Sequence, residues 1–310
     1  MSATERLTVR ITGLRDLGEI RVLDLGATSD RPLPGWEPGA HIELVLPTGL
    51  TRRYSLCGDP AHPATYRVAV LREEWSRGGS EYIHRYLRLG QHLETGAPVN
   101  NFPLRAHDRY VFIAGGIGIT PILPMATRTF RAGAQVEVHC AGGPGAMELA
   151  RELARAVPPT SVYPRGHTPR MDVHRIVSGA EPGTGIYCCG PQRLLDAVAA
   201  TPTAADVQLE KFRPTRKKLA PPKPFDAVAV RSGITVHVEP EQSLLTMLEA
   251  AGVPVSGSCR EGVCGSCRVG VVEGAVDHRD DLLDDAGRER GDLMYPCVSR
   301  GASGVLVLDI

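Results

Sequence analysis

The chain has 310 residues, of which 42% are apolar and 23% charged, as in ordinary globular proteins. This length predicts two or three domains, and the composition excludes a disordered chain, a collagen and a coiled coil. No apolar stretch approaches the roughly 18 residues of a membrane span, and the first residues show no apolar secretory signal. We therefore expect a cytoplasmic protein with no membrane attachment.

The 35 basic and 35 acidic residues cancel, which argues against a nucleic-acid-binding protein that relies on a global basic field. The charge is unevenly distributed, because the segment from Phe225 to Ile310 has 14 acidic and 7 basic residues and so carries −7. Residues 1–224 then carry +7. An acidic third of this kind can steer a partner protein.

Residues 1–105 show the pattern of an all-β domain. Short stretches with alternating apolar residues, such as 7–11, 41–46, 51–56 and 65–71, are separated by turns rich in Gly, Pro and Asp. One helix is expected near 80–87. Many short strands with turn signals predict a small antiparallel β-barrel.

Residues 106–212 change to an alternation of strands and helices. The run RYVFIA is continuously apolar, as expected for a strand that is buried on both faces, and four further strand segments alternate with helical ones. This rhythm predicts an α/β domain with a parallel sheet and helices on both faces.

Residues 213–224 are predicted to be an extended, exposed linker, because four Pro and five Lys or Arg in twelve residues cannot form a core. Residues 225–310 form a third domain: a hairpin, a helix with Ser243 as its N-cap and Gly252 just past its end, a Gly/Cys/Ser-rich loop and further strands. The acidic run at 277–285 is expected to be first of all a solvated loop.

The strongest motif lies in this third domain. Cys259, Cys264 and Cys267 have the spacing C-x4-C-x2-C, and Cys297 follows, which is the plant-type ferredoxin spacing for a 2Fe–2S cluster. Small residues let the loop curl around a cluster, and Arg260 and Arg268 are placed to offset its negative charge. Structural zinc is the alternative, but zinc sites favour paired C-x2-C knuckles.

From about Ala40 to Ile310 the sequence resembles the phthalate dioxygenase reductase family, which includes vanillate demethylase reductases. That family has a flavin domain, an NAD domain and a C-terminal plant-type ferredoxin domain of the β-grasp type, in this order. The resemblance implies the same cofactors here: FMN, NADH and a 2Fe–2S cluster. FAD in place of FMN is an alternative that the residues leave open.

Two motifs in residues 1–105 resemble the flavin motifs of that family. Arg52, Tyr54, Ser55 and Leu56 resemble its R-x-Y-S-L motif, and Arg77, Gly78, Gly79 and Ser80 resemble its RGGS phosphate clamp. The resemblance implies that Arg52 and Arg77 bind the flavin phosphate, that Tyr54 lies against the ring system and that Ser55 contacts the ring edge. A helix start with small residues suits a phosphate, and an arginine fork suits it as well.

Glycines also follow the first strand of the α/β domain, in the segment GGIGITP. It resembles the nucleotide-binding turn of ferredoxin–NADP reductase-like proteins, and its candidate residues are Gly115, Gly116, Gly118, Thr120 and Pro121. The turn Cys189-Gly190-Pro191 and the ring of Phe212 complete the set, and the resemblance implies that Cys189 lies beside the nicotinamide and Phe212 near the flavin. No Arg or Lys occurs after the strand VEVHC until Arg151, which favours NADH.

Together these motifs predict an oxidoreductase that passes electrons from NADH through FMN and the 2Fe–2S cluster to a partner oxygenase. By resemblance the partner is a Rieske-type ring-hydroxylating or O-demethylating oxygenase, with a haem-thiolate monooxygenase of the cytochrome P450 type as the alternative. A ferredoxin-like carrier or a zinc-binding interaction protein is the hypothesis outside enzymes. We expect a monomer that binds no nucleic acid.

Overall fold

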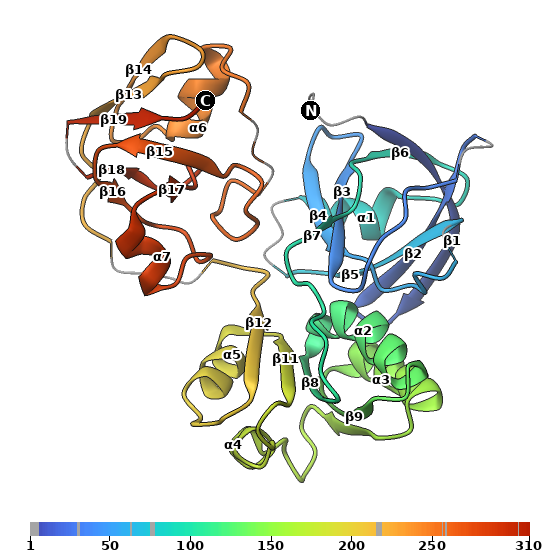
Figure 1. The fold of residues 1–310 in the computed structure, drawn as a ribbon. Helices are drawn as coiled ribbons and strands as arrows, with labels where there is room; N and C mark the ends of the chain where they lie inside the picture. Colours follow the sequence, from blue (N-terminus) through green and yellow to red (C-terminus); the bar gives the residue numbers. More distant parts are fainter. Residues whose placement is uncertain are drawn as a thin grey trace. The chain divides into compact units, whose positions relative to one another are not determined.

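The computed structural model describes residues 6–29, 32–62, 64–74, 78–214, 219–255, 257, 259–302 and 304–310. The chain divides into two compact units, one formed by residues 4–212 and the other mainly by residues 213–310 (Figure 1). None of the helices within the described residues is long and apolar enough to cross a bilayer.

The first unit begins with an antiparallel sheet, as the alternating pattern predicts. Its strands are β1 (Leu7–Leu17), β2 (Ile20–Ala27), β3 (Ala40–Val45), β4 (Thr51–Ser55), β5 (Thr65–Leu71), β6 (His92–Thr95) and β7 (Val99–Asn100), and helix α1 spans Gly79–Tyr86. The sheet order is β4-β3-β6-β1-β2-β5, with β7 beside β3. A single bridge from Leu56 to Val68 brings the two edges together, so the sheet curls towards a barrel around a core that includes Leu25, Ile42 and Tyr66.

The same unit continues into a five-stranded parallel sheet with the order β10-β9-β8-β11-β12. Its strands are β8 (Arg109–Gly115), β9 (Gln135–Gly142), β10 (Thr160–Pro164), β11 (Gly185–Cys189) and β12 (Asp206–Glu210). The intervening helices are α2 (Ile119–Arg131), α3 (Pro144–Ala156), α4 (Val173–Ser178) and α5 (Gln192–Ala199), and a short 3₁₀ turn covers Gly116–Gly118. The predicted α/β architecture is thus present.

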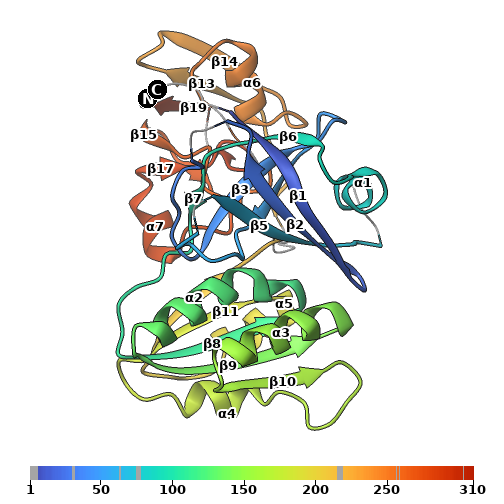
Figure 2. The same cartoon turned by 90° about the vertical axis from the view of Figure 1, so that its right-hand side faces the viewer.

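Successive side chains of β8 face two different cores. Phe112 packs with α2 and α3, whereas Val111 and Ile113 pack with α4 and α5. Figure 2 shows α2 and α3 between the parallel sheet and the antiparallel sheet. Because Ile20, Val22 and other residues of the antiparallel sheet join the core on that side, the two sheets form one packed body.

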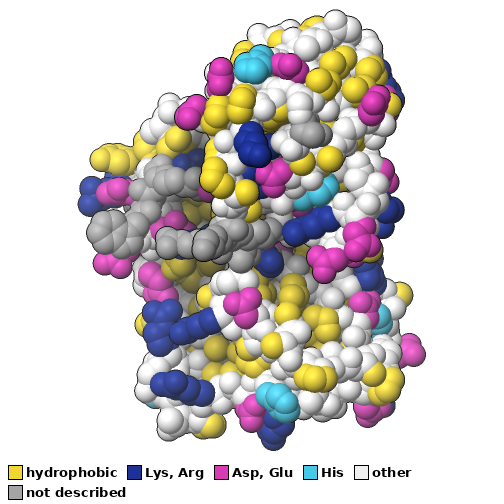
Figure 3. Space-filling view, turned by 90° about the vertical axis from the view of Figure 1, so that its left-hand side faces the viewer, with side chains coloured by type: hydrophobic (Ala, Val, Ile, Leu, Met, Phe, Trp, Pro, Cys, Tyr) yellow, Lys and Arg dark blue, Asp and Glu magenta, His cyan; other side chains and the backbone are white. Residues whose placement is uncertain are grey.

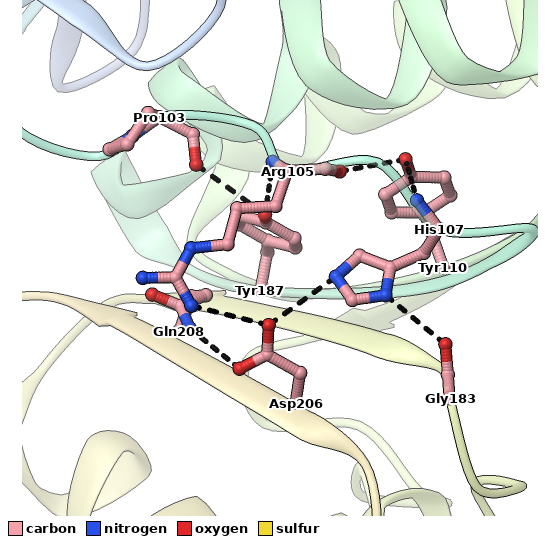
Figure 4. A network of polar contacts seen from close by, with 8 residues as sticks. All are labelled: Pro103, Arg105, His107, Tyr110, Gly183, Tyr187, Asp206 and Gln208. Carbon is pink, nitrogen blue, oxygen red and sulfur yellow. Dashed lines mark hydrogen bonds and ion pairs between the residues drawn. The ribbon is translucent and has the colours of Figure 1, made fainter.

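A polar network holds the connection between these two sheets (Figure 4). The backbone N–H of Arg105 donates to the hydroxyl of Tyr187 at 2.7 Å, and the Arg105 guanidinium lies 3.3 Å from Asp206. The ring of His107 is bonded to the carbonyl of Gly183 at 3.1 Å and lies 3.4 Å from Asp206. Asp206 and Gly185 begin their strands, so the network ties down the amino edge of the sheet and leaves the carboxyl edge to ligands.

The second unit is a five-stranded sheet with the order β14-β13-β19-β15-β17. Its strands are β13 (Phe225–Ala229), β14 (Ile234–Val238), β15 (Val269–Glu273), β17 (Leu293–Met294) and β19 (Val305–Leu308); β16 (Val276–Asp277) pairs with β18 (Arg300–Gly301). Helix α6 (Leu244–Ala250) packs Leu244 and Leu248 into the sheet's core, which is a β-grasp arrangement. Ser243 caps it by accepting from the N–H of Thr246, and Gly252 follows with φ of 76°, both as expected.

The acidic segment differs from the expected solvated loop. It contains the short helix α7 (Asp285–Arg290), for which Asp284 is the N-cap and accepts from the N–H of Gly287 at 2.7 Å. Asp280 is fully buried, and its carboxylate accepts from the N–H groups of Leu282 and Leu283 and from the hydroxyl of Ser299. Part of the acidic run is therefore ordered, because Asp284 caps a helix and Asp280 accepts hydrogen bonds within the loop.

Acidic and basic side chains are interspersed on the face drawn in Figure 3. On that face, therefore, neither the excess of acidic residues in 225–310 nor the excess of basic residues in 1–224 forms a patch of one sign.

Candidate functional site

Three of the four cysteines of the ferredoxin-type motif lie side by side in the second unit. The Cys297 thiol is hydrogen-bonded to both Cys259 and Cys267, although these residues are 38 and 30 positions away. Cys264, Cys267 and Cys297 are buried and Cys259 is partly exposed. These three neighbouring thiols, with Cys264 three residues before Cys267 on the same loop, fit the four-thiolate donor set of a 2Fe–2S cluster.

The loop that carries three of these cysteines depends on unusual backbone conformations. Gly262 and Gly265 have φ of 70° and 77°, and a Cβ on Gly262 would lie 3.0 Å from the Cα of Asp280. Arg260 also has a positive φ, 54°, which is uncommon for a residue with a side chain. The backbone N–H of Glu261 points at sulfur here and donates to Cys259 Sγ at 3.3 Å. The loop is therefore shaped to hold and hydrogen-bond a sulfur-ligated group.

One of the two basic residues of this loop has a partner within the unit. The Arg260 guanidinium forms an ion pair with Glu249 of α6 at 2.7 Å. In the described part of the chain, no three His, Cys, Asp or Glu side chains are grouped around a position for one metal ion. A 2Fe–2S cluster makes a different demand, two thiolates for each of two irons.

The two flavin motifs meet between β4 and the start of α1. A Cβ added to Gly79 would lie 2.7 Å from Arg52 Nε, so the arginine side chain rests directly on the glycine that opens the helix. Gly78 is the N-cap, with φ of 86°, and Ser80 Oγ accepts from the backbone N–H of Glu73 at 3.2 Å. The contact brings a guanidinium to the N-terminus of a helix, a combination that binds phosphate.

Strand alternation separates the residues of the R-x-Y-S-L segment. Arg53 points away from Arg52 and pairs with Glu43 at 3.1 Å, so Arg53 stabilises the sheet. Tyr54 is largely enclosed, and burial raises the pKa of its phenol. Ser55 and Leu56 are buried. Arg77, the other predicted phosphate ligand, lies outside the described residues.

The glycine-rich turn after β8 and the Cys189-Gly190-Pro191 turn after β11 touch one another. A Cβ on Gly118 would lie 2.3 Å from the carbonyl oxygen of Cys189, and a Cβ on Gly115 would lie 2.6 Å from Pro191 Cδ. The helix after β8 covers one face of the sheet and the helix after β11 covers the other. The strand order therefore reverses here, which is where open α/β sheets bind nucleotides.

Within this turn the residues differ in accessibility. Gly116 has φ of 59°, and its missing side chain leaves open space. Thr120 is buried and donates its hydroxyl to the carbonyl of Ile117 at 3.0 Å, and Pro121 is buried in the first turn of α2. Gly116 is thus the accessible glycine of the turn, whereas Gly115 and Gly118 are buried and Thr120 and Pro121 shape the turn.

Comparisons with known proteins agree with this geometry. Residues 228–300 match the family model of the 2Fe-2S iron-sulfur cluster binding domain. The chain is 38% identical to the heme-dependent oxidative N-demethylase beta subunit of Ectopseudomonas mendocina (strain ymp), over 98% of this chain and 99% of that protein. It is 34% identical to phthalate dioxygenase reductase of Burkholderia cepacia, over 90% and 89% of the two chains. The chain belongs to the phthalate dioxygenase reductase family.

Two solved structures extend the comparison of this reductase. One is phthalate dioxygenase reductase, described as a modular structure for electron transfer from pyridine nucleotides to [2Fe-2S]; it has a TM-score of 0.70 and 31% identity, with 98% of both chains covered. The other is an intact type IV self-sufficient cytochrome P450 monooxygenase, with a TM-score of 0.87 and 40% identity. The match covers 98% of the reductase and 41% of that longer chain.

The reductase places the carboxyl group of Glu210 beside Cys189, a contact that the sequence does not predict. Glu210 is opposite Cys189 in the register of β11 and β12, and the two side chains are hydrogen-bonded. Burial raises the pKa of Glu210 to about 8, and burial together with this carboxyl raises the pKa of the Cys189 thiol. Both groups are therefore uncharged at neutral pH. The sequence signal that could have indicated Glu210 is its place at the carboxyl end of a predicted strand next to the switch point.

The neighbours of this pair have different surroundings. Cys188 faces the opposite side of the sheet and is buried in the core with α4 and α5. Phe212, two residues beyond Glu210, keeps 38% of its surface exposed. An exposed aromatic ring at this position is available to a ligand at the carboxyl edge.

Proposed function

We propose that this reductase takes electrons from NADH onto FMN, passes them to a 2Fe–2S cluster and delivers them to a separate oxygenase. In this proposal residues 1–105 bind FMN, residues 106–212 bind NADH, residues 213–224 link the parts and residues 225–310 hold the cluster. The observation that carries it is the presence, in one chain, of a three-cysteine loop beside Cys297, an arginine on a helix start and a glycine turn at a strand switch point. Each fits one of the three redox groups.

The residues of the chain bind and orient in this scheme. Arg52 and the backbone of Gly78, Gly79 and Ser80 would hold the FMN phosphate, while Tyr54, Ser55 and Leu56 would border the ring system. FMN supplies the step between a two-electron donor and a one-electron acceptor when bound. Hydride transfer moves a hydrogen nucleus together with its two bonding electrons, so no side chain needs to act as acid or base in that step.

The nucleotide would lie along the carboxyl edge of the parallel sheet. The backbone of Gly115, Gly116 and Gly118 would approach its pyrophosphate, with Gly190 and Pro191 closing the crevice. Cys189, kept neutral by burial, would contact the nicotinamide, and the ring of Phe212 would approach the flavin. A neutral Glu210 beneath Cys189 avoids placing a negative charge there.

Cys259, Cys264, Cys267 and Cys297 would ligate the cluster. When bound, the cluster supplies a one-electron relay. The N–H of Glu261 and the hydroxyl of Ser266, which lies 3.3 Å from Cys264 Sγ, would hydrogen-bond ligand sulfurs and adjust the reduction potential.

The partner is an oxygenase component, as it is for relatives such as the phthalate 4,5-dioxygenase oxygenase reductase subunit of Pseudomonas putida. A Rieske-type oxygenase is our first candidate. A haem-thiolate monooxygenase is the second, because the similarity to the cytochrome P450 chain is high. We further propose a cytoplasmic monomer that meets its partner transiently, which size-exclusion chromatography with light scattering would test.

The proposal is tested by the cofactors and by two electron acceptors. We expect anaerobically purified protein to contain about two irons and two acid-labile sulfides per chain. Extraction with mass analysis should yield FMN, and NADH should drive reduction of both ferricyanide and cytochrome c. Recovery of FAD would overturn the flavin assignment. A colourless protein that cannot be reconstituted with flavin and iron would overturn the function.

A further inference from the structure

The reductase has a pocket of about 460 Å³ at the carboxyl ends of β9 and β10, and its lining includes none of the residues named in the proposed site. Its lining includes Gly142 and Gly143 after β9, Pro164 and Arg165 at the end of β10, and Leu17 and Gly18 of the turn between β1 and β2. These residues all belong to the unit formed by residues 4–212. The pocket is therefore built by one packed body.

The pocket continues directly from the glycine turn that faces the pyrophosphate. A Cβ on Gly142 would lie 3.2 Å from the Cα of Gly116, so the ends of β8 and β9 are in contact. The nicotinamide end of a dinucleotide lies at the switch point between β8 and β11, and its other end must extend over the neighbouring strands. On this sheet those strands are β9 and β10.

We propose that this pocket binds the adenosine ribose of the nucleotide and that Arg165 binds a 2′-phosphate on it, so that the reductase uses NADPH as well as NADH. The inference rests on the proposed function and names its coenzyme range. The segment after β9 has no Arg or Lys and by itself favours NADH. Arg165 follows the neighbouring strand β10, and the fold brings it to the same pocket as that segment.

The charges around the pocket support a phosphate at Arg165. Two carboxylates line it, but Asp16 is bonded to Arg21 at 2.6 Å and Glu148 is bonded to Arg151 at 2.5 Å. In the described part of the chain, by contrast, Arg165 has no acidic partner within ion-pair distance. Its backbone N–H donates to the carbonyl of Gly142 at 2.7 Å, which fixes the arginine next to β9.

Two further features decide where the phosphate would lie. The segment Ala141–Gly145 contains no acidic residue that would bind the ribose hydroxyls and repel a 2′-phosphate. The N-terminus of α3 is occupied by the protein's own Glu19, whose carboxylate accepts from the N–H of Gly145 at 3.4 Å. A phosphate is thus directed to the arginine, with the exposed His167 on the same rim.

Steady-state kinetics with ferricyanide as the acceptor test this inference. We expect kcat/KM for NADPH within about tenfold of that for NADH, and an Arg165→Ala variant that lowers the NADPH value by about 10- to 30-fold, because a hydrogen bond to a charged phosphate is lost. The NADH value should fall by at most about threefold. Arg165→Lys should recover part of the NADPH activity, and Arg170→Ala, an exposed arginine outside the pocket lining, is the matched control.

A binding measurement keeps the test independent of catalysis. By calorimetry we expect adenosine 2′,5′-bisphosphate to bind the purified reductase about tenfold or more tighter than adenosine 5′-monophosphate, with the difference lost in Arg165→Ala. Equal affinities for the two probes, or an NADPH activity that Arg165→Ala leaves unchanged, would overturn the inference while NADH activity remained. Absence of NADH oxidation with intact binding of the bisphosphate would instead contradict the proposed function.

Discussion

The cysteine loop and the nucleotide crevice are assembled in opposite ways. Three of the four cluster ligands lie within nine residues of one another, so the loop itself defines most of the site. The crevice takes its residues from the ends of β8, β9, β10, β11 and β12, which are distributed over about 100 positions. A local site can be recognised from spacing, whereas an assembled site is visible only when strand order places the ends together.

The largest expected effect tests the local site. Replacing one cluster ligand, in Cys264→Ser, should abolish stable cluster binding. Loss of a residue that only supports a ligand costs ~10- to 100-fold in metal affinity or activity, and we expect a larger loss than this in NADH-driven cytochrome c reduction. NADH-driven ferricyanide reduction should stay within about twofold, because the flavin and nucleotide residues lie in the other unit. Cys140→Ala, in the core of the parallel sheet, is the control. Equal loss with both acceptors would show that the cluster does not follow the flavin.

The next effect tests the assembled site at its closest contact. In Gly118→Ala the new Cβ would lie 2.3 Å from the Cys189 carbonyl oxygen, so the turns after β8 and β11 must separate. A displacement of about 1 Å at a reacting centre costs ~100-fold in rate, and we expect that loss in NADH oxidation. Iron content should remain unchanged. Gly35→Ala is the matched control, since a Cβ there meets nothing within 4 Å, and an active Gly118→Ala variant would place the nucleotide elsewhere.

The difference between a local site and an assembled site also explains which features could be predicted from the sequence. The order of strands and helices, the cap at Ser243 and the cysteine ligands follow from periodicity and spacing, and the structure bears out the architecture. The contact of Arg52 with Gly79 and the role of Arg165 require knowledge of which segments meet in space. Asp280 shows the limit most clearly: in a run of acidic residues its burial depends on Ser299 and on two backbone N–H groups that only the folded loop supplies.

A third prediction concerns the contact between the two flavin motifs. Arg52→Ala should weaken FMN binding by about 10- to 100-fold, because a charged hydrogen bond to the phosphate is removed. Riboflavin, which has no phosphate, should bind the variant and the parent protein equally well. Fluorescence titration of the apoprotein with both flavins measures this, with Arg10→Ala on the exposed face of β1 as the control. A similar loss for riboflavin would show that the arginine acts through the fold of the strand.

The smallest expected effect concerns Glu210, the carboxyl group that spacing did not reveal. Its pKa is about 8 in the folded chain and about 4.5 in the unfolded one, so folding retains a proton between these values. Stability from this proton is complete below pH 4.5 and is lost as the pH rises through 8. One carboxyl oxygen of Glu210 is buried although the residue as a whole keeps some exposed surface, so we count only part of the shift and expect a decline on the order of 1–2 kcal/mol between pH 5 and 9.

Glu210→Gln isolates this contribution, because the amide keeps the shape of the side chain and cannot titrate. Urea unfolding of the variant and the parent protein at pH 5, 7 and 9 should give free energies that fall less steeply with pH in the variant. Gln208, on the same strand, offers the matched control Gln208→Glu, whose carboxyl would not adjoin Cys189. Parallel profiles for Glu210→Gln and the parent protein would mean that Glu210 is ionised at neutral pH, and a negative charge would then stand beneath Cys189 where the nicotinamide is proposed to bind.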